Sequence, residues 1–319
     1  MNNCLKTTLK QEVTDTTIPF LGELTINVIN KDNASLPKHL IVNVTQPVEF
    51  RVIGDGLIGG VKKYTVTPQF DGSDVILPVS TGEYTIKITN KYFIKTLVLV
   101  HPMFKLNTKQ LDNMISLESL NFDDSSTTGD LSDFTQLVAL KTLSGIRASG
   151  LNGDISNLSS LMNIESIMLG DTGIHGSINL LANLPALNDL RVDYCENVTG
   201  NISEFNDIIS RFTTLFIHGT SISGDISNLD TTVFSVPSQY SNFSWKNTRP
   251  ASKYIMSLSS FNLGEDVDKM LIDQAECIKP TDVSSYIIDV YGTRTSSSDS
   301  AVSKLKSKGY TIKINGVII

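Results

Sequence analysis

Cysteine, tryptophan and long apolar runs are all scarce in this chain. Its 319 residues include three cysteines, Cys4, Cys195 and Cys277, and a single tryptophan. Three widely spaced cysteines do not make a disulfide framework, so we expect reduced thiols and a chain stable in a reducing cytoplasm. No apolar run approaches the roughly 20 residues of a membrane span. The first residues carry no apolar segment of a secretory or lipoprotein leader, so the sequence predicts neither export nor membrane insertion.

Positive charge is also in short supply. Lys and Arg number 26 against 33 Asp and Glu, which gives a formal charge of -7 and a pI near 5.1. The basic residues are scattered, whereas proteins that bind nucleic acid need clustered Lys and Arg to neutralise phosphates. We therefore expect no nucleic-acid partner.

Catalytic and metal-binding motifs are missing as well. The four histidines lie far apart in the sequence, and none has the spacing of a metal-ligand motif. The Gly54–Gly59 segment matches G-x-G-x-x-G, but strand-like residues follow it, which favours a hairpin loop over a dinucleotide site. The sequence thus predicts a protein that is not an enzyme and uses no cofactor or metal.

The N-terminal part alternates apolar and polar residues with a period of two. Turn residues separate seven such runs, whose apolar members are Leu24, Ile26 and Val28; Leu40, Val42 and Val44; Val48, Phe50 and Val52; Tyr64 and Val66; Val75, Leu77 and Val79; Tyr84, Ile86 and Ile88; Leu97 and Leu99. This pattern predicts an antiparallel β-sandwich over residues 21–101, immunoglobulin-like in architecture. Residues 1–20 form an N-terminal arm, helical or extended.

The centre of the chain repeats one short motif five times. A glycine, a small polar residue, an aliphatic residue and a polar residue recur at 129–132, 153–156, 176–179, 200–203 and 224–227, with spacings of 24, 23, 24 and 24 residues. So constant a period is typical of a solenoid. Asp recurs in the motif without a calcium loop's other ligands, which favours a role in turns over metal binding.

An aliphatic triplet with the spacing L-x-x-L-x-L precedes each motif. Its members are Leu117, Leu120 and Phe122; Leu140 and Leu143, with Gly145 in third place; Ile164, Ile167 and Leu169; Leu187, Leu190 and Val192; Phe212, Leu215 and Ile217. On these residues the chain resembles the leucine-rich-repeat proteins over about residues 111–230. The resemblance implies a parallel sheet, with one strand and one short helical or irregular return in each coil.

The chain departs from the family at two points. The Pro that usually follows the Gly-x-Ile element is replaced by Ser or Asn, and the Asn ladder is replaced by Ser125, Ala148, Thr172, Cys195 and Thr220. We expect Ser and Thr hydroxyls to bond the backbone of a neighbouring coil and the ladder to be weakest at Ala148. Cys195 then has a structural role rather than a reactive one.

Past the repeats, strand and helix patterns alternate. Strands are predicted at Phe243–Trp245, Tyr254–Met256, Tyr286–Val290 and Tyr310–Ile314, and helices at Glu265–Glu276 and Ser297–Lys308. The units would continue the parallel sheet as an α/β C-terminal cap, with Trp245 in the core. The predicted organisation is therefore an arm (1–20), a sandwich (21–101), a solenoid (102–230) that opens with a cap at Pro102–Met114, and a C-terminal cap (231–319).

The exposed side of the repeat strands is the one candidate binding surface. Residues between the aliphatic positions form two columns: Asn121, Ser144, Met168, Arg191 and Phe216; then Asp123, Ile146, Gly170, Asp193 and His218. With the flanking Asp171 and Tyr194, the residues predicted to contact a partner are Met168, Asp171, Arg191, Asp193, Tyr194, Phe216 and His218. Aromatic residues, Met and Arg are enriched at protein interfaces, while the alternative is an ordinary solvated sheet.

The layout suggests where such a protein acts. The Gly-Asp-Ile-Ser repeats and the segment Tyr291-Gly292-Thr293-Arg294-Thr295 resemble leucine-rich-repeat proteins of gut Bacteroidales bacteria and their crAss-like phages. This resemblance implies a non-enzymatic virion component, such as a fibre or a head or tail decoration protein. Its partners would be virion proteins or a host receptor or glycan, and it would form homo-oligomers. The alternative is a bacterial cell-surface adhesin or carbohydrate-binding protein.

Overall fold

The computed structural model describes residues 22–30, 39–54, 62–66, 74–76, 82–228, 243–246, 257–277 and 286–319. The chain divides into two compact units. The N-terminal unit comprises residues 1–153 and 160–164, and the C-terminal unit comprises residues 154–159 and 165–319. The predicted N-terminal arm lies outside the described residues. No helix in the described part of the chain combines the length and apolarity needed to cross a membrane.

The N-terminal unit contains two sets of antiparallel strands. One sheet has the order β4-β3-β6-β1-β8. Its strands are β1 (Glu23–Asn30), β3 (Val48–Gly54), β4 (Lys62–Val66), β6 (Gly82–Thr89) and β8 (Phe104–Lys105). In the second set, β2 (His39–Val44) pairs with β5 (Asp74–Ile76) on one side and β7 (Ile94–Val98) on the other.

Alternation of buried and half-buried residues explains these strands, because side chains on a strand point to opposite faces in turn. In β6, for example, Tyr84, Ile86 and Ile88 are buried. Strand β3, which ends at Gly54, pairs antiparallel with β4, and most of the G-x-G-x-x-G segment between them lies outside the described residues. The predicted residues Leu77 and Val79 lie outside the described part, and the immunoglobulin-like arrangement stays a prediction.

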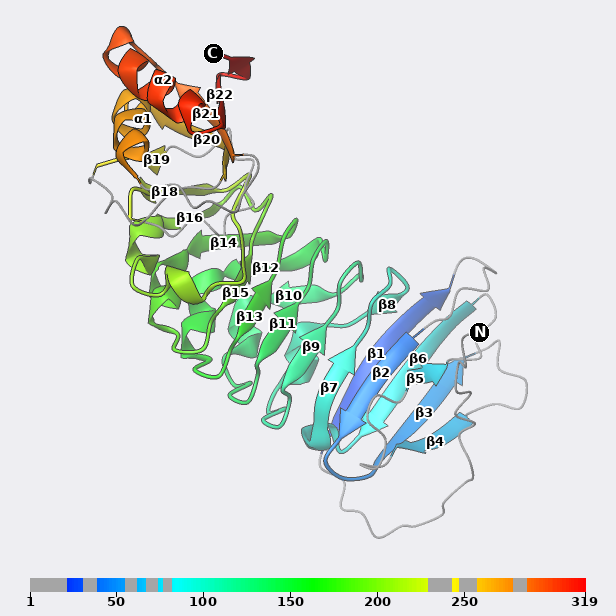
Figure 1. The fold of residues 1–319 in the computed structure, drawn as a ribbon. Helices are drawn as coiled ribbons and strands as arrows, with labels where there is room; N and C mark the ends of the chain where they lie inside the picture. Colours follow the sequence, from blue (N-terminus) through cyan, green and yellow to red (C-terminus); the bar gives the residue numbers. More distant parts are fainter. Residues whose placement is uncertain are drawn as a thin grey trace, which may run out of the picture. The chain divides into compact units, whose positions relative to one another are not determined.

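The repeat coils continue directly from these strands. In Figure 1, β7 pairs in parallel with β9 (Ser119–Asn121), which pairs in parallel with β11 (Thr142–Ser144). A second set begins where the Thr128 N–H donates to the Leu106 carbonyl (2.8 Å) and continues from β10 (Thr128–Asp130) to β12 (Gly150–Asp154). Short 3-10 helices, η1 (Lys91–Phe93) and η2 (Thr108–Leu111), lie in the connections.

Each coil of the C-terminal unit also contributes two strands. Strands β13 (Ser166–Met168), β15 (Asp189–Arg191) and β17 (Thr214–Phe216) are parallel neighbours. Strands β14 (Gly173–Ser177), β16 (Val198–Asn201), β18 (Ser221–Asp225) and β19 (Phe243–Ser244) form the second parallel set. The prediction of one strand per coil was therefore wrong, because the glycine motif itself runs extended and pairs with its equivalent in the next coil.

In the first four motifs, the polar residue after the glycine caps the short 3-10 helix that follows. The Asp130 carboxylate accepts from the Ser132 N–H (2.9 Å), and the Asn201 side-chain oxygen accepts from the Ser203 N–H (3.1 Å). The capped helices are η3 (Leu131–Phe134), η4 (Ile155–Ser160), η5 (Ile178–Asn183) and η6 (Ile202–Phe205), and η7 (Ile209–Arg211) adds a turn after η6 in the same coil. The motif's predicted role in turns is confirmed.

The small residues that replace the Asn ladder are buried, except for the half-buried Thr172, and they bond differently from the prediction. The Thr172 hydroxyl donates to the Leu169 carbonyl (2.7 Å) and the Thr220 hydroxyl to the Ile217 carbonyl (2.6 Å). Both bonds stay within one coil, because a short side chain on the turn lies closest to its own strand end. The weakness expected at Ala148 stays a prediction.

The C-terminal segment folds as its own α/β layer. Strands β20 (Ser257–Gly264), β21 (Tyr286–Gly292) and β22 (Tyr310–Ile314) are parallel, and β23 (Val317–Ile318) pairs antiparallel with β22. The helices are α1 (Val267–Glu276) and α2 (Asp299–Ser307), the latter preceded by η9 (Ser296–Ser298). The predicted strand Tyr254–Met256 lies outside the described residues.

This layer corrects one expectation and confirms another. In the described residues β20 to β23 form a separate four-stranded sheet rather than an extension of the repeat sheets. The two-residue strand β19, by contrast, continues the repeat sheet, because it pairs in parallel with β18. Trp245 is fully buried as predicted, and its indole N–H donates to the Asp273 carboxylate (3.0 Å).

Candidate functional site

The structure places all seven predicted contact residues in the C-terminal unit. Met168, Arg191 and Phe216 end the neighbouring strands β13, β15 and β17, where Met168 is in register with Arg191 and Arg191 with Phe216. The other four lie on the turns that follow: Asp171, Asp193, Tyr194 and His218. We call Arg191, Asp193, Tyr194, Phe216 and His218 the strand-end cluster.

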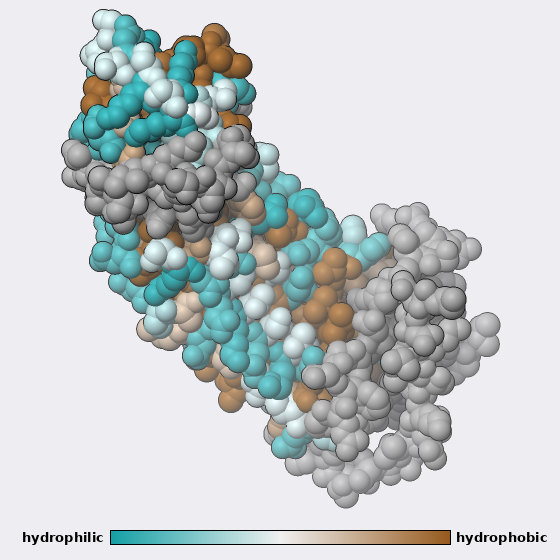
Figure 2. All heavy atoms as spheres, in the orientation of Figure 1, coloured by the Kyte–Doolittle hydropathy of each residue, from teal (hydrophilic) through white to brown (hydrophobic). Residues whose placement is uncertain are grey.

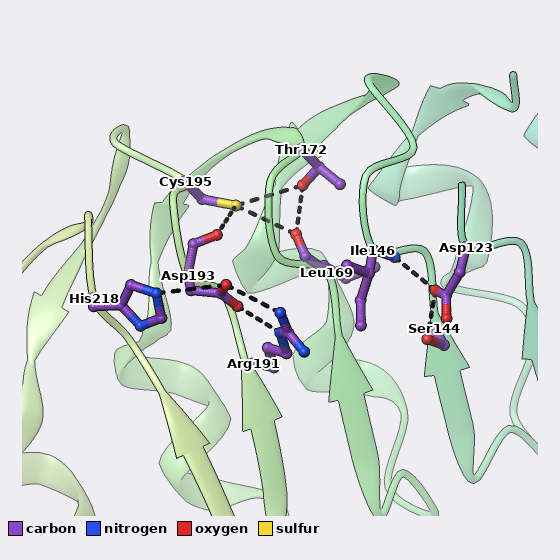
Figure 3. Close-up of polar contacts among 9 residues, drawn as sticks. All are labelled: Asp123, Ser144, Ile146, Leu169, Thr172, Arg191, Asp193, Cys195 and His218. Carbon is purple, nitrogen blue, oxygen red and sulfur yellow. Dashed lines mark hydrogen bonds and ion pairs between the residues drawn. The ribbon is translucent and has the colours of Figure 1, made fainter. Parts of the chain in front are cut away.

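An ion pair anchors this cluster (Figure 3). The Arg191 guanidinium donates to both carboxylate oxygens of Asp193, at 2.7 and 3.3 Å. The Asp193 side chain is only 3% exposed, and that of Arg191 is 32% exposed. A carboxylate taken out of water is costly unless it is paired and hydrogen-bonded, so Arg191 is needed where it lies.

The prediction that all column residues point to solvent was therefore wrong in part. Asp193, Ser144 and Gly170 are buried. Gly170 explains the burial of Asp193, since a Cβ at Gly170 would lie 2.3 Å from its Oδ1 atom. The absence of a side chain in one coil thus opens a recess for the carboxylate of the next.

Aromatic rings complete the cluster. The Arg191 guanidinium carbon lies 5.4 Å from the centre of the Phe216 ring, a distance at which a cation is attracted to the ring face. The His218 ring meets the Tyr194 ring edge to face, with centroids 4.6 Å apart, and its Nε2 atom lies 3.7 Å from the Asp193 carboxylate. Cation and rings therefore pack as one surface.

The turn residues Asp171 and Tyr194 stand at the rim. Both adopt the left-handed backbone conformation, with φ of 56° and 59°. The Asp171 N–H donates to the Asp193 carbonyl (2.7 Å) and the Tyr194 N–H to the His218 carbonyl (2.8 Å), so the two residues hold the same position in adjacent coils. Tyr194 is 61% exposed. This conformation is uncommon for Tyr and costs backbone free energy.

Cys195 lies beneath the rim and has a structural environment (Figure 3). Its thiol donates to the Leu169 carbonyl of the preceding coil (3.3 Å) and lies 3.5 Å from the Thr172 hydroxyl. Burial raises the pKa of this thiol. A thiol that resists ionisation is a poor nucleophile, which supports its predicted structural role.

Charged pairs join successive coils of the N-terminal unit. The Asp124 carboxylate receives two bonds from the Arg147 guanidinium, at 2.5 and 2.7 Å, and these bonds hold the pKa of Asp124 below its usual value. Hydrogen bonds from Lys95 and Lys141 likewise lower the pKa of Glu118. These pairs were not predicted from the sequence, although their spacing of 23 residues equals one coil and would have revealed them.

Asp123 in the same unit is also engaged rather than free. Its Oδ1 atom accepts from the Ser144 hydroxyl and from the Ile146 N–H, both at 2.7 Å (Figure 3). Figure 2 shows a largely hydrophilic surface over the repeats in that view, with small hydrophobic areas between. Within the ranges that the structure describes, no group of three or more His, Cys, Asp or Glu is placed to hold a metal ion.

Coils of about 24 residues, two parallel strands per coil and a buried L-x-x-L-x-L triplet together define a leucine-rich-repeat solenoid. No protein-family model matches the sequence, and no curated protein matches it.

Solved structures with some similarity include a plant peptide hormone receptor, RGFR1, in complex with RGF2. That match has 14% identity and a TM-score of 0.43 over 65% of this chain and 37% of the receptor chain. The PEPR1–AtPEP1 structure matches at 17% identity and a TM-score of 0.46, over 70% of this chain and 35% of that one. An internalin (inlF) from Listeria monocytogenes matches at 16% identity and a TM-score of 0.40. That match covers 70% of this chain and 74% of the internalin chain.

This chain therefore spans little more than a third of the two receptor chains. None of the three TM-scores reaches 0.5, so the assignment of the fold rests on the repeat geometry.

Proposed function

We propose that the chain is a non-enzymatic protein-binding module whose contact surface is the strand-end cluster with Met168 and Asp171. The observation that carries this proposal is the packing of Arg191, Phe216, His218 and Tyr194 into one surface. Arg and aromatic side chains dominate the binding energy of protein interfaces. A preformed surface also loses little conformational entropy when a partner binds.

Tyr194 and Phe216, rather than Arg191, are the residues to replace in a test of this proposal. Removing Arg191 would leave the Asp193 carboxylate buried and unpaired, so loss of binding would be confounded with loss of stability. The better variant combines Tyr194→Asn, which tolerates the left-handed conformation, with Phe216→Thr, which suits a strand.

The experiment uses a photo-crosslinking amino acid in place of Tyr194 and, in a matched control, in place of Leu180. Leu180 is 51% exposed and lies in η5, which follows β14 and is not part of the β13, β15 and β17 strand set. We expect a partner protein to crosslink at position 194 only, and the purified partner to bind the double variant at least tenfold more weakly, as loss of two interface aromatics implies. Equal crosslinking at both positions, or an unchanged Kd, would contradict the proposal.

The biological setting and the architecture of the N-terminal strands are separate proposals. The sequence predicts a virion component, with a cell-surface adhesin as the alternative, and mass spectrometry of phage particles and host envelope fractions separates them. Recovery in the host envelope alone rules out the virion. The domain limits at residues 20, 101 and 230 and the immunoglobulin-like packing also stay predictions.

A further inference from the structure

The turn residue that follows the strand differs in chemical character between the two units. In the N-terminal unit, the Asp124 N–H donates to the Ile146 carbonyl (2.8 Å), which places Asp124 beside Arg147 of the next coil. In the C-terminal unit, the Asp171 N–H donates to the Asp193 carbonyl (2.7 Å), which places Asp171 beside Tyr194. The register is the same in both places, so Tyr194 occupies the position at which Arg147 stands.

Because Tyr194 stands where an arginine stands in the other unit, the Asp171 carboxylate has no cationic partner at that position. Asp124 forms a bidentate pair with Arg147. Asp171 is exposed, and within the described residues its carboxylate makes no hydrogen bond or ion pair. Adjacent parallel strands lie about 4.8 Å apart. Because the Asp171 N–H bonds the carbonyl of the residue before Tyr194, Asp171 and Tyr194 are neighbours on adjacent coils.

A carboxylate beside an aromatic ring suits one kind of incoming group. A guanidinium pairs with a carboxylate through two parallel hydrogen bonds, and its planar face stacks on an aromatic ring. The strand-end cluster already shows the second contact, since Arg191 lies over Phe216. The neighbouring Arg191 charge does not compete for Asp171, because its guanidinium is bonded to Asp193.

We propose that Asp171 and Tyr194 form a seat for an arginine side chain of the partner protein. The inference rests on the proposed function and adds the chemistry of the partner. The incoming arginine would pair with Asp171 as Arg147 pairs with Asp124. The strand-end cluster would hold the apolar residues around that arginine.

A random-peptide phage-display library selected against the intact chain provides the probe. We expect selected peptides to share an arginine. Replacing this arginine with citrulline, which keeps the shape and removes the charge, should weaken binding at least tenfold, as should Asp171→Asn. Asp207→Asn, which removes an exposed carboxylate on the helical side of a coil in the same unit, should leave the Kd unchanged.

A second variant fills the seat from within. Tyr194→Arg recreates the Asp124–Arg147 arrangement at Asp171, so it should abolish peptide binding while the melting temperature stays equal or rises. A melting temperature that falls, with Asp171→Asn still binding fully, would overturn the proposal.

The outcomes separate the two proposals. Peptides that bind without any basic residue, ignore Asp171→Asn and are lost in the Tyr194→Asn/Phe216→Thr variant overturn the arginine seat and leave the protein-binding function. Peptides that also bind this double variant normally overturn both, as does a library that yields no binder.

Discussion

A single buried carboxylate organises the strand-end cluster. Asp193 is held by Arg191 on one side and faces His218 on the other, inside a recess that exists because residue 170 is glycine. The same arginine forms the exposed surface over Phe216. Arg191 therefore contributes both to stability and to the proposed binding surface. Tyr194 at the rim belongs to the binding surface but is not part of the Arg191–Asp193 ion pair.

The first prediction follows from that link. Arg191→Ala should lower the free energy of unfolding by roughly 2–4 kcal/mol, because a nearly buried carboxylate loses its partner. Urea denaturation of this variant is compared with Tyr194→Asn, which we expect to change stability by less than about 1 kcal/mol, as for an exposed side chain. Equal stabilities of the two variants would contradict the buried-pair explanation.

Repeat elements depend on the glycine of each motif for a steric reason as well as a conformational one. Gly224 has φ +124°, and a Cβ there would lie 2.1 Å from the Asn201 Oδ1 atom of the preceding coil. Asn201 is the residue that caps η6 by accepting from the Ser203 N–H (3.1 Å). At Gly224, the missing side chain therefore leaves room for the capping residue of the preceding coil.

The second prediction tests this contact. Gly224→Ala should lower the free energy of unfolding by roughly 2 kcal/mol or more, because backbone strain adds to a clash with the capping side chain of Asn201. Gly264→Ala is the matched control, because Gly264 has φ +53° and nothing within 4 Å of the added carbon. We expect about 1 kcal/mol for the control, from backbone strain alone. Thermal unfolding monitored by circular dichroism gives both values, and similar costs would exclude the steric role.

A third prediction concerns Asp268 in the first turn of α1, which bonds the residues just before α2. Burial raises the pKa of Asp268, but hydrogen bonds from Ser298 and Thr295 outweigh it and lower that pKa to about 2. The folded pKa lies below the unfolded value of about 3.9, so the stabilisation is complete above that value and is lost as pH falls through 2. Melting temperatures of the intact chain and Asp268→Asn should differ at pH 5 and converge towards pH 2. A constant difference would contradict this pKa assignment.

Among the secondary-structure elements, those that follow from a local periodic pattern were predicted well from the sequence. Features that depend on contacts with a neighbouring coil were predicted poorly. The strands at Leu24–Val28 and the helix ending at Glu276 follow from the spacing of apolar residues, which is a local property. The second strand of each coil was missed, because its pairing depends on the neighbouring coil rather than on its own apolar pattern. The burial of Asp193 was missed for a similar reason, since it depends on Gly170 one coil earlier.

In the whole molecule, the single tryptophan lies where the last coil meets the α/β layer. The Trp245 N–H donates to the Asp266 carboxylate (2.8 Å), and its indole bonds Asp273 in α1. Strand β19, which ends just before it, pairs with β18 of the last coil. The terminal coil of a solenoid needs a capping element that covers its apolar core. Trp245 therefore connects the α/β layer, which is that cap, to the repeats.

The fourth prediction is that Trp245→Ala opens the last coil before the earlier ones. Loss of a fully buried tryptophan costs about 3–5 kcal/mol. Hydrogen exchange should therefore accelerate in β18, whose edge β19 covers, more than in β13, whose neighbour β15 is unaffected. Trp245→Phe keeps most of the packing volume and should show a smaller effect. Uniform acceleration across β13 and β18 would mean that the C-terminal unit opens as one body, and the α/β layer would then act as part of the solenoid rather than as its removable cap.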